Sequence, residues 1–168
     1  MSWNDYVNAY LINNTDSNSG KVIQNACDHA AIVGNTDGVV WASSPGFSLG
    51  SYSESVEDEN GHSSKVNIDQ FANLLQAFNN NGVCSNIGGI RIQQEKYFAV
   101  SFDSDRNVMY LKKNGGGACV GKSGLAFVIG TYNVGKKAIR DGVEAPQNPG
   151  YCNLCCESLV DFLVSNNL

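Results

Sequence analysis

Residues 116–123 read GGACVGKS and match the phosphate-binding loop pattern G-x-x-x-x-G-K-S. In that motif a helix begins at the lysine, so that backbone amides and the helix dipole face a phosphate. Here residues 125–132 are rich in β-branched and aromatic types, which favour a strand. The chain after Ser123 is also too short for the parallel sheet of a nucleotide-binding domain. We therefore predict a glycine-rich connection between strands, and a P-loop nucleotide-binding protein is the remote alternative.

Six cysteines could support thiol or metal chemistry. Cys152, Cys155 and Cys156 lie close together, but a tetrahedral metal site needs more ligands at suitable spacing. The remaining cysteines and the two histidines are isolated in the sequence: Cys27, Cys84, Cys119, His29 and His62. We therefore predict no metal site and no cofactor, and expect buried cysteines that pack as small apolar residues.

Composition and charge exclude several classes of function. The net charge of -5 argues against nucleic-acid binding, which depends on neutralising phosphates. No apolar run approaches the roughly 20 residues of a membrane span. The N-terminus lacks the basic start and apolar stretch of a signal peptide, so we expect a cytosolic protein with free thiols. Neither histidine belongs to a local nucleophile motif, and the acidic residues 54–59 fit a solvated loop, so no catalytic site is predicted.

Helices are predicted at both ends of the chain and in the middle. Residues 2–5 (SWND) fit a capping box, and apolar residues then recur at helical spacing, which predicts a helix over residues 3–13. A second helical turn is predicted over 21–27. Asn67 is a plausible N-cap for a helix that ends near residue 79. An amphipathic helix closes the chain and ends at residues 166–168.

Between these helices the pattern predicts strands. Two β runs, 29–34 and 39–43, are joined by a turn with Asp37-Gly38, a strong hairpin signal. Further strands are predicted over residues 87–92, 97–102, 108–111, 118–120 and 125–132. Residues 51–65 and 133–149 are predicted to be loops. This order favours a single α+β domain over residues 1–168, with a central antiparallel β-sheet of about six to seven strands and the terminal helices packed on it.

Aromatic residues gather at the N-terminal helix. Trp3, Tyr6 and Tyr10 share one helix face, and Trp41 lies on the predicted hairpin. Such a stripe would bury well in an ordinary core. It would equally suit a shallow groove for proline-rich ligands, because Trp and Tyr offer flat apolar faces and hydrogen-bond donors. Spacing alone leaves both interpretations open.

Several segments resemble the profilin family, in order and from end to end. They are residues 1–7 (MSWNDYV), 30–42 (AAIVGNTDGVVWA), 87–91 (IGGIR), 112–117 (KKNGGG), 125–132 (LAFVIGTY), 149–154 (PGYCNL) and 159–163 (LVDFL). The resemblance implies an antiparallel sheet with the N- and C-terminal helices side by side on one face. It also implies a non-enzymatic, cytoplasmic and cytoskeletal adaptor that binds monomeric actin and proline-rich proteins such as formins. Such an adaptor regulates actin polymerisation, by monomer sequestration among other routes, and promotes nucleotide exchange on actin.

By position, the resemblance implies a poly-proline-binding set of Trp3, Tyr6, Trp41, Phe162 and Leu168. Family members commonly have Tyr or His at the position of Phe162, so a hydrogen-bond donor to the ligand is absent here. The implied actin-binding set is Lys112, Lys113, Gly150, Asn153, Leu154 and Ser158. Leu154 and Ser158 stand where many relatives are charged, which leaves open a proline-binding module with weakened or lost actin binding.

Three stretches depart from shorter relatives: residues 51–65, 93–106 and 136–147. Each fits a tolerated surface loop, and the last could instead tune the actin contact. Family members also bind phosphoinositides through basic patches, and the excess of 16 acidic over 11 basic residues argues against that activity here. Nothing in the sequence requires oligomerisation, so a monomer is expected.

Overall fold

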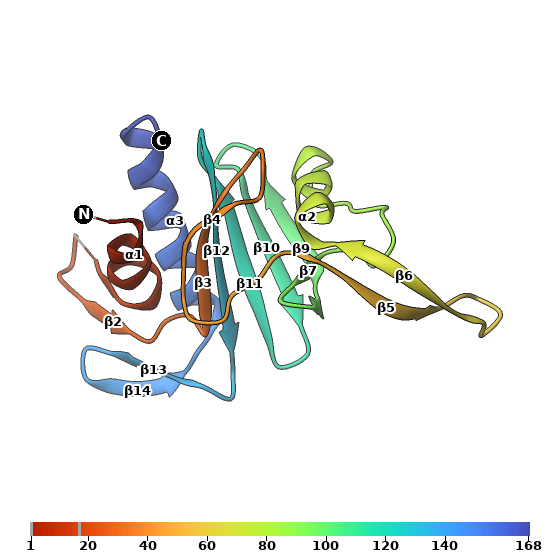
Figure 1. The fold of residues 1–168 in the computed structure, drawn as a ribbon. Helices are drawn as coiled ribbons and strands as arrows, with labels where there is room; N and C mark the ends of the chain where they lie inside the picture. The colour runs from red at the N-terminus through yellow and green to blue at the C-terminus, as the bar shows by residue number, and fades with distance from the viewer. Residues whose placement is uncertain (1, 17) are drawn as a thin grey trace.

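The central element is a six-stranded antiparallel sheet, seen in a computed structural model that describes residues 2–16 and 18–168 (Figure 1). Its strands, in order across the sheet, are β4 (Val40–Ser43), β3 (His29–Gly34), β12 (Ala126–Asn133), β11 (Gly116–Lys122), β10 (Val108–Lys113) and β9 (Phe98–Asp103). Successive side chains of a strand point to opposite faces, so the buried sheet supports two cores. One core contains Ile32 and Val128, and the other contains Val33 and Phe127.

The terminal helices lie side by side over one face of the sheet (Figure 1). The N-terminal helix consists of α1 (Trp3–Tyr6) and a π-helical continuation, η1 (Val7–Ile12), and the C-terminal helix is α3 (Pro149–Ser165). The predicted capping box is present: the Ser2 amide donates to Asp5 Oδ2 at 2.7 Å, and the Asp5 amide donates to Ser2 Oγ at 3.3 Å. The α+β fold predicted from the sequence, with both terminal helices on one face, is therefore confirmed.

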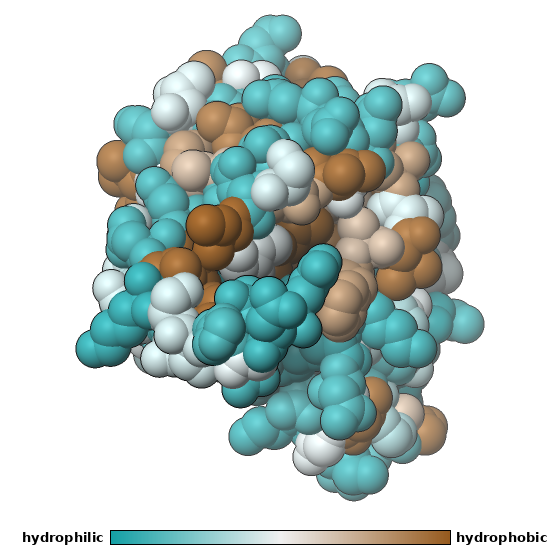
Figure 2. Space-filling model, turned by 90° about the vertical axis from the view of Figure 1, so that its right-hand side faces the viewer, coloured by the Kyte–Doolittle hydropathy of each residue, from teal (hydrophilic) through white to brown (hydrophobic). Residues whose placement is uncertain are grey.

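Helix α2 (Gln70–Asn79) covers the opposite face of the sheet. Leu74, Ala77 and Phe78 pack there against Val33 and Phe127. The predicted N-cap, Asn67, is wrong by two residues, because Asp69 accepts a hydrogen bond from the Ala72 amide at 3.0 Å. Seen from the α2 side, the surface carries brown apolar side chains scattered among teal polar ones (Figure 2). None of the helices in the described ranges is long and apolar enough to span a membrane.

The predicted loop over residues 51–65 is instead most of a β-hairpin. Strands β5 (Ser51–Glu57) and β6 (Ser63–Asp69) pair antiparallel and extend away from the sheet (Figure 1). In β5, Tyr52, Glu54 and Val56 are half-buried and alternate with exposed residues. Its apolar residues, Tyr52, Val56, Val66 and Ile68, all lie on one face, but Glu54 and Ser64 interrupt that face, so the alternation is a weak signal in the sequence.

Two further predictions are wrong where a second, smaller sheet forms beside the terminal helices (Figure 1). The predicted loop at 133–149 contains β13 (Lys137–Arg140) and β14 (Val143–Pro146), and the predicted helical turn at 21–27 contains β2 (Val22–Gln24). With β1 (Asn14–Thr15) they form a four-stranded sheet in the order β1-β2-β13-β14. Asp141 and Gly142, at φ of 51° and 81°, form the tight turn of the β13–β14 hairpin.

The strand predicted over residues 87–92 shrinks to β7 (Arg91–Ile92), which pairs with β8 (Glu95–Lys96). Gly88 and Gly89 have φ of 90° and 67°, a left-handed backbone that cannot continue a strand. The other predicted strands are found within a few residues of their expected positions.

Candidate functional site

A continuous row of half-buried aromatic rings runs along the seam between the terminal helices and β4. The Trp41 and Trp3 ring centroids lie 5.0 Å apart, and those of Trp3 and Tyr6 lie 5.6 Å apart. Tyr6 is 5.5 Å from Phe162, which is 5.4 Å from Tyr10. These spacings are typical of tilted aromatic pairs. From the sequence, these rings could equally belong to the core or to a surface groove. In the structure they pack against the core cluster but stay partly exposed, which favours the groove.

The row contains four of the five predicted poly-proline-binding residues and adds one. Tyr10 joins it because residues 3, 6 and 10 fall on one helix face, although the resemblance implied only Trp3 and Tyr6 of these three. The fifth predicted residue, Leu168, packs against the same core cluster, half-buried. We refer to Trp3, Tyr6, Tyr10, Trp41, Phe162 and Leu168 as the aromatic groove.

Backbone hydrogen bonds hold Leu168 in place. Its amide donates to the Leu163 carbonyl at 2.9 Å, and its carbonyl accepts from the Gly124 amide at 2.9 Å. The turn that carries Gly124 is in turn held by the buried Asn35 side chain, whose amide donates to the carbonyls of Ser123 at 3.1 Å and Gly124 at 3.2 Å. The end of the chain is thus tied to the β11–β12 turn.

The residues predicted to bind actin lie around α3 and along β10. Lys112 and Asn153 line one hollow of about 410 Å³, together with Val100, Tyr110 and Pro149, and we call it the sheet hollow. Gly150 is exposed in the first turn of α3. Lys113 is half-buried, forms an ion pair with Glu95 and places its Nζ 5.6 Å from the centre of the Tyr97 ring.

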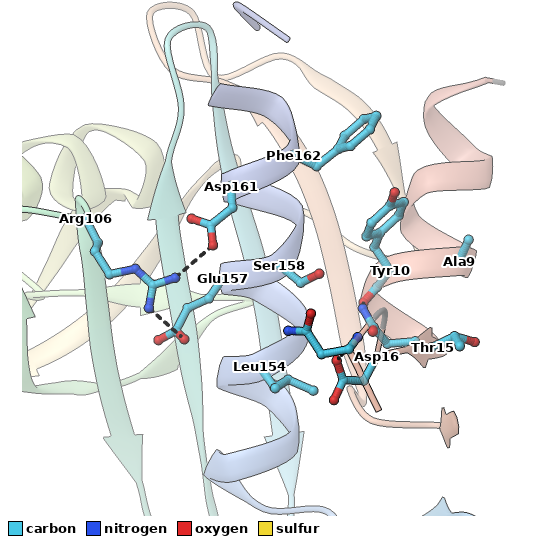
Figure 3. Close-up of a pocket in the computed structure, with 12 residues that line it drawn as sticks. Ala9, Tyr10, Thr15, Asp16, Arg106, Leu154, Glu157, Ser158, Asp161 and Phe162 are labelled. Carbon is cyan, nitrogen blue, oxygen red and sulfur yellow. Dashed lines mark hydrogen bonds and ion pairs between the residues drawn. The ribbon is translucent and has the colours of Figure 1, made fainter. Parts of the chain in front are cut away.

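Leu154 and Ser158 line a different hollow, of about 670 Å³, between η1 and α3 (Figure 3). Tyr10 and Phe162 also line this interhelix hollow, so it continues the aromatic groove. The structure therefore divides the predicted actin-binding set. Lys112 and Asn153 line the sheet hollow, whereas Leu154 and Ser158 lie beside the end of the aromatic row.

A polar network that the sequence analysis did not identify joins α3 to the β9–β10 hairpin. Arg106 donates to Glu157 Oε2 at 3.1 Å and to Asp161 Oδ2 at 3.0 Å (Figure 3). The Tyr110 hydroxyl donates to the other carboxylate oxygen of Glu157. Burial and this hydrogen bond raise the pKa of Tyr110 above its usual range. The sequence shows that Glu157 and Asp161 are spaced i, i+4 on one helix face, but it gives no sign that Arg106, about fifty residues earlier, pairs with both.

The GKS motif does not form a phosphate-binding loop. Gly116–Lys122 is strand β11, and strand β12 follows, so no helix begins at Lys122. A Cβ atom on Gly117 would lie 2.4 Å from the Tyr132 hydroxyl, and one on Gly121 would lie 2.3 Å from Val160 Cγ2. These glycines thus allow close packing within the sheet and under α3. The segment is a strand of the sheet and not the connection between strands that the sequence predicted.

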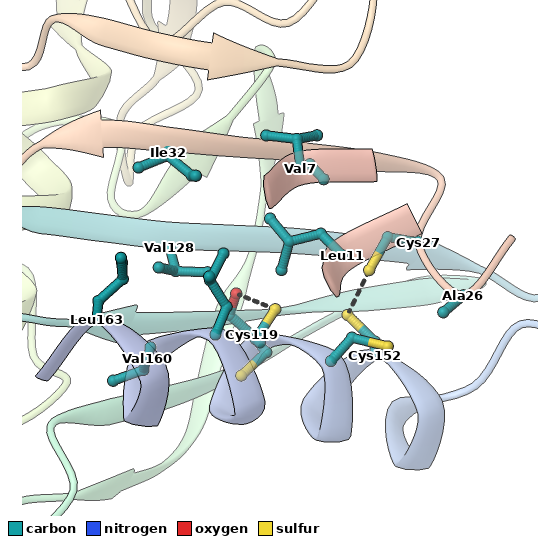
Figure 4. Packing of buried hydrophobic residues seen from close by; sticks show 14 of the residues in the cluster. Val7, Leu11, Ala26, Cys27, Ile32, Cys119, Val128, Cys152, Val160 and Leu163 are labelled. Carbon is teal, nitrogen blue, oxygen red and sulfur yellow. Dashed lines mark hydrogen bonds between the residues drawn. The ribbon is translucent and has the colours of Figure 1, made fainter. Parts of the chain in front are cut away.

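The prediction that Cys27 and Cys119 are isolated is wrong in space. The Cys27 thiol lies 3.7 Å from Cys152 Sγ, and the Cys156 thiol points to the Cys119 carbonyl oxygen at 3.7 Å (Figure 4). These four residues are buried, and all are free thiols, as expected.

The whole chain, residues 1–168, matches the family model described as Profilin. It is 43% identical to a profilin of Tetrahymena pyriformis over 139 residues, which cover 81% of this chain and 86% of that protein. The chain belongs to the profilin family. Profilins are non-enzymatic regulators of actin polymerisation that bind actin monomers and poly-proline, so membership confirms the function that the resemblance implied.

Solved profilin structures share the fold of this profilin. Acanthamoeba castellanii profilin IB superposes with a TM-score of 0.64 at 26% identity, over 99% of this chain and 100% of that one. Mouse profilin IIa, solved with a double repeat from the FH1 domain of mDia1, superposes with a TM-score of 0.50 at 17% identity, over 84% of this chain and 89% of that one.

Proposed function

We propose that this profilin acts in the cytoplasm and cytoskeleton as a single-domain, monomeric adaptor with two binding faces. One face takes the proline-rich segments of partners such as formins, and the other takes monomeric actin. The observation that carries the proposal is the unbroken aromatic row between the terminal helices, with centroid spacings of 5.0–5.6 Å from Trp41 to Tyr10.

The proline-binding face consists of the aromatic groove. A polyproline II helix has no internal hydrogen bonds, so its carbonyl groups can accept bonds from a partner while its rings pack on flat aromatic faces. The indole N–H groups of Trp3 and Trp41 and the hydroxyls of Tyr6 and Tyr10 are the available donors. Phe162 supplies only an apolar face, so its part of the groove selects for shape rather than for a hydrogen bond.

The actin-binding face consists of Lys112 and Asn153, which line the sheet hollow, with Gly150 next to Pro149. Of the other predicted residues, Leu154 and Ser158 border the aromatic groove, and Lys113 pairs with Glu95 beside Tyr97 of the other core. Apolar side chains extend it, because Phe98 and Val100 on the edge strand β9 are each 65% exposed, and Val100 lines the sheet hollow with Lys112 and Asn153. An exposed apolar patch beside a cation suits a protein interface. A preference for one of two actin conformations would couple this binding to nucleotide exchange on actin.

The proline-binding face is tested by intrinsic tryptophan fluorescence during titration with a proline decamer. Both tryptophans of the chain lie in the aromatic groove, so wild type should give a saturable change. Trp3→Ala should abolish it, whereas Tyr52→Ala, which removes a half-buried ring from the β5–β6 hairpin, should bind as wild type does. Unchanged binding by Trp3→Ala would refute the assignment of the groove.

The actin-binding face is tested by the assembly of pyrene-labelled actin at several concentrations of this profilin. Wild type should slow spontaneous assembly, and Lys112→Glu should weaken the effect, mainly through the association rate and its salt dependence. Lys65→Glu reverses an exposed charge on β6 and is the matched control. No effect of the wild-type protein on assembly would favour the alternative, a proline-binding module that has lost actin.

A further inference from the structure

Three cysteine thiols from distant parts of the chain meet inside the core between the terminal helices and the sheet. Cys27 lies between β2 and β3, and Cys152 and Cys156 lie one helical turn apart on α3. Their sulfur atoms all lie within 4.8 Å of one another, and the Cys27 and Cys152 sulfurs are 3.7 Å apart (Figure 4). Each of the three residues is at most 1% exposed.

The sulfurs converge on a glycine of the central sheet. A Cβ atom on Gly130 would lie 2.6 Å from Cys156 Sγ, 3.0 Å from Cys27 Sγ and 3.3 Å from Cys152 Sγ. Any side chain at this position would occupy the space that the three thiols share. The grouping therefore depends on a bare backbone in β12 as well as on the cysteines.

Packing as small apolar residues explains why these cysteines are buried, but it does not explain why the sulfurs of three of them lie within 4.8 Å of one another. Cys155 is on the same helix and equally buried, yet it does not belong to the mutually close set. A zinc–sulfur bond of about 2.3 Å places two sulfurs of a tetrahedral site about 3.8 Å apart. The Cys27–Cys152 separation of 3.7 Å meets that requirement without rearrangement.

A fourth cysteine lies next to the group, although its sulfur is not within 4.8 Å of all three others. Cys119 lies on β11 directly opposite Gly130 of β12, and its carbonyl oxygen accepts from the Cys156 thiol at 3.7 Å. Cys119 is fully buried in the same core cluster. Four-cysteine shells are a common form of structural zinc site, and thiolates select soft ions over hard ones.

We propose that Cys27, Cys152 and Cys156 bind one soft, thiophilic metal ion of the zinc class, with Cys119 as the residue placed to complete its shell. Each ligating thiol releases its proton to solvent as the ion binds. Because Cys27 lies between β2 and β3 and the other two lie on α3, the ion would fasten α3 to the chain segment that leads into the central sheet. Its entry requires the N-terminal segment to part from α3, since the sulfurs are closed off from solvent.

The test uses the reduced, chelator-treated full-length protein, titrated with Cd²⁺ and then with Zn²⁺. We expect one ion per chain, a thiolate-to-cadmium absorption band in the ultraviolet, and protection of at least three thiols from a thiol reagent. Zinc at a free concentration 100-fold above its Kd should raise Tm by about 5–10 °C. These readouts need only the wild-type protein, so a variant that fails to fold does not remove the test.

Variants identify the ligands. Cys152→Ala should lose the absorption band and the rise in Tm. Cys155→Ala, a buried cysteine on the same helix, and Cys84→Ala, a cysteine outside the cluster, should keep both. Absence of stoichiometric binding by the wild type would overturn the proposal. Equal binding by Cys152→Ala would do the same, and so would a Cys27–Cys152 disulfide that forms while zinc is present.

Discussion

Replacement of Asn35 by alanine should weaken both the fold and the proline-binding groove, although its side-chain hydrogen bonds go to the β11–β12 turn. Its buried side-chain amide donates to the carbonyls of Ser123 and Gly124, and the Gly124 amide holds the Leu168 carbonyl at 2.9 Å. Ser123 is 5% exposed, so its carbonyl would lose its partner with little access to water. An unsatisfied buried group of this kind costs about 1–3 kcal/mol of folding free energy.

For a chain of this length such a loss lowers Tm by about 2–12 °C. Because the turn would no longer be held, Leu168 should also become less well placed, and the affinity for a proline decamer should fall about two- to tenfold, which is up to about 1.4 kcal/mol. Circular dichroism would give Tm, and calorimetric titration well below Tm would give the affinity of the folded protein.

The matched control is Asn80→Ala, which removes an exposed asparagine with one long hydrogen bond of 3.4 Å to the Val83 carbonyl. This variant should differ little from wild type in either measurement. The reasoning is refuted if Asn35→Ala behaves like Asn80→Ala in both stability and affinity.

Three further predictions concern stability. Gly130→Ala should lower the free energy of unfolding, measured by urea titration, by about 1–3 kcal/mol, because its Cβ would overlap three cysteine sulfurs. Gly50→Ala should lower it less, and equal losses in the two variants would contradict the packing argument. Burial and the hydrogen bond to Glu157 raise the pKa of Tyr110. The stability that the protonated Tyr110 contributes should therefore be complete below about pH 10 and be lost as pH rises further, and this loss of stability at alkaline pH should be smaller in Tyr110→Phe. Hydrogen bonds from the N-cap serine lower the pKa of Asp5. The capping interaction should therefore be complete above about pH 4 and be lost as pH falls through the lowered pKa. Asp5→Asn should show a smaller loss of helical ellipticity on acidification than wild type.

The parts of the fold that were readable from the sequence carry strong local signals. The capping box at Ser2 and Asp5 marked the first helix, and the Asp37-Gly38 turn marked the β3–β4 hairpin, as the structure has them. The aromatic stripe was readable because residues 3, 6 and 10 share a helix face, but only the family resemblance favoured a proline-binding groove over a core. The family resemblance added Trp41 and Phe162, which no spacing rule connects to that helix.

The parts that were missed depend on contacts between distant segments. In the β5–β6 hairpin, Glu54 and Ser64 interrupt the one apolar face, so its period of two is weak in the sequence. Strand β2 is short and depends on pairing with β13, more than a hundred residues later in the chain. The same holds for Cys27, which meets Cys152 only because the fold brings the β2–β3 connection against α3.

The central claim is that one chain offers separate faces to actin and to proline-rich ligands. The most direct test is the fluorescence anisotropy of a labelled proline decamer titrated with this profilin, alone and with saturating monomeric actin. If the faces are independent, the Kd of the decamer should agree within about twofold in the two titrations, as expected for sites that share no contacts. Displacement of the decamer by actin, or a loss of affinity greater than about tenfold, would contradict the claim and would mean that the two ligands compete for the interhelix hollow.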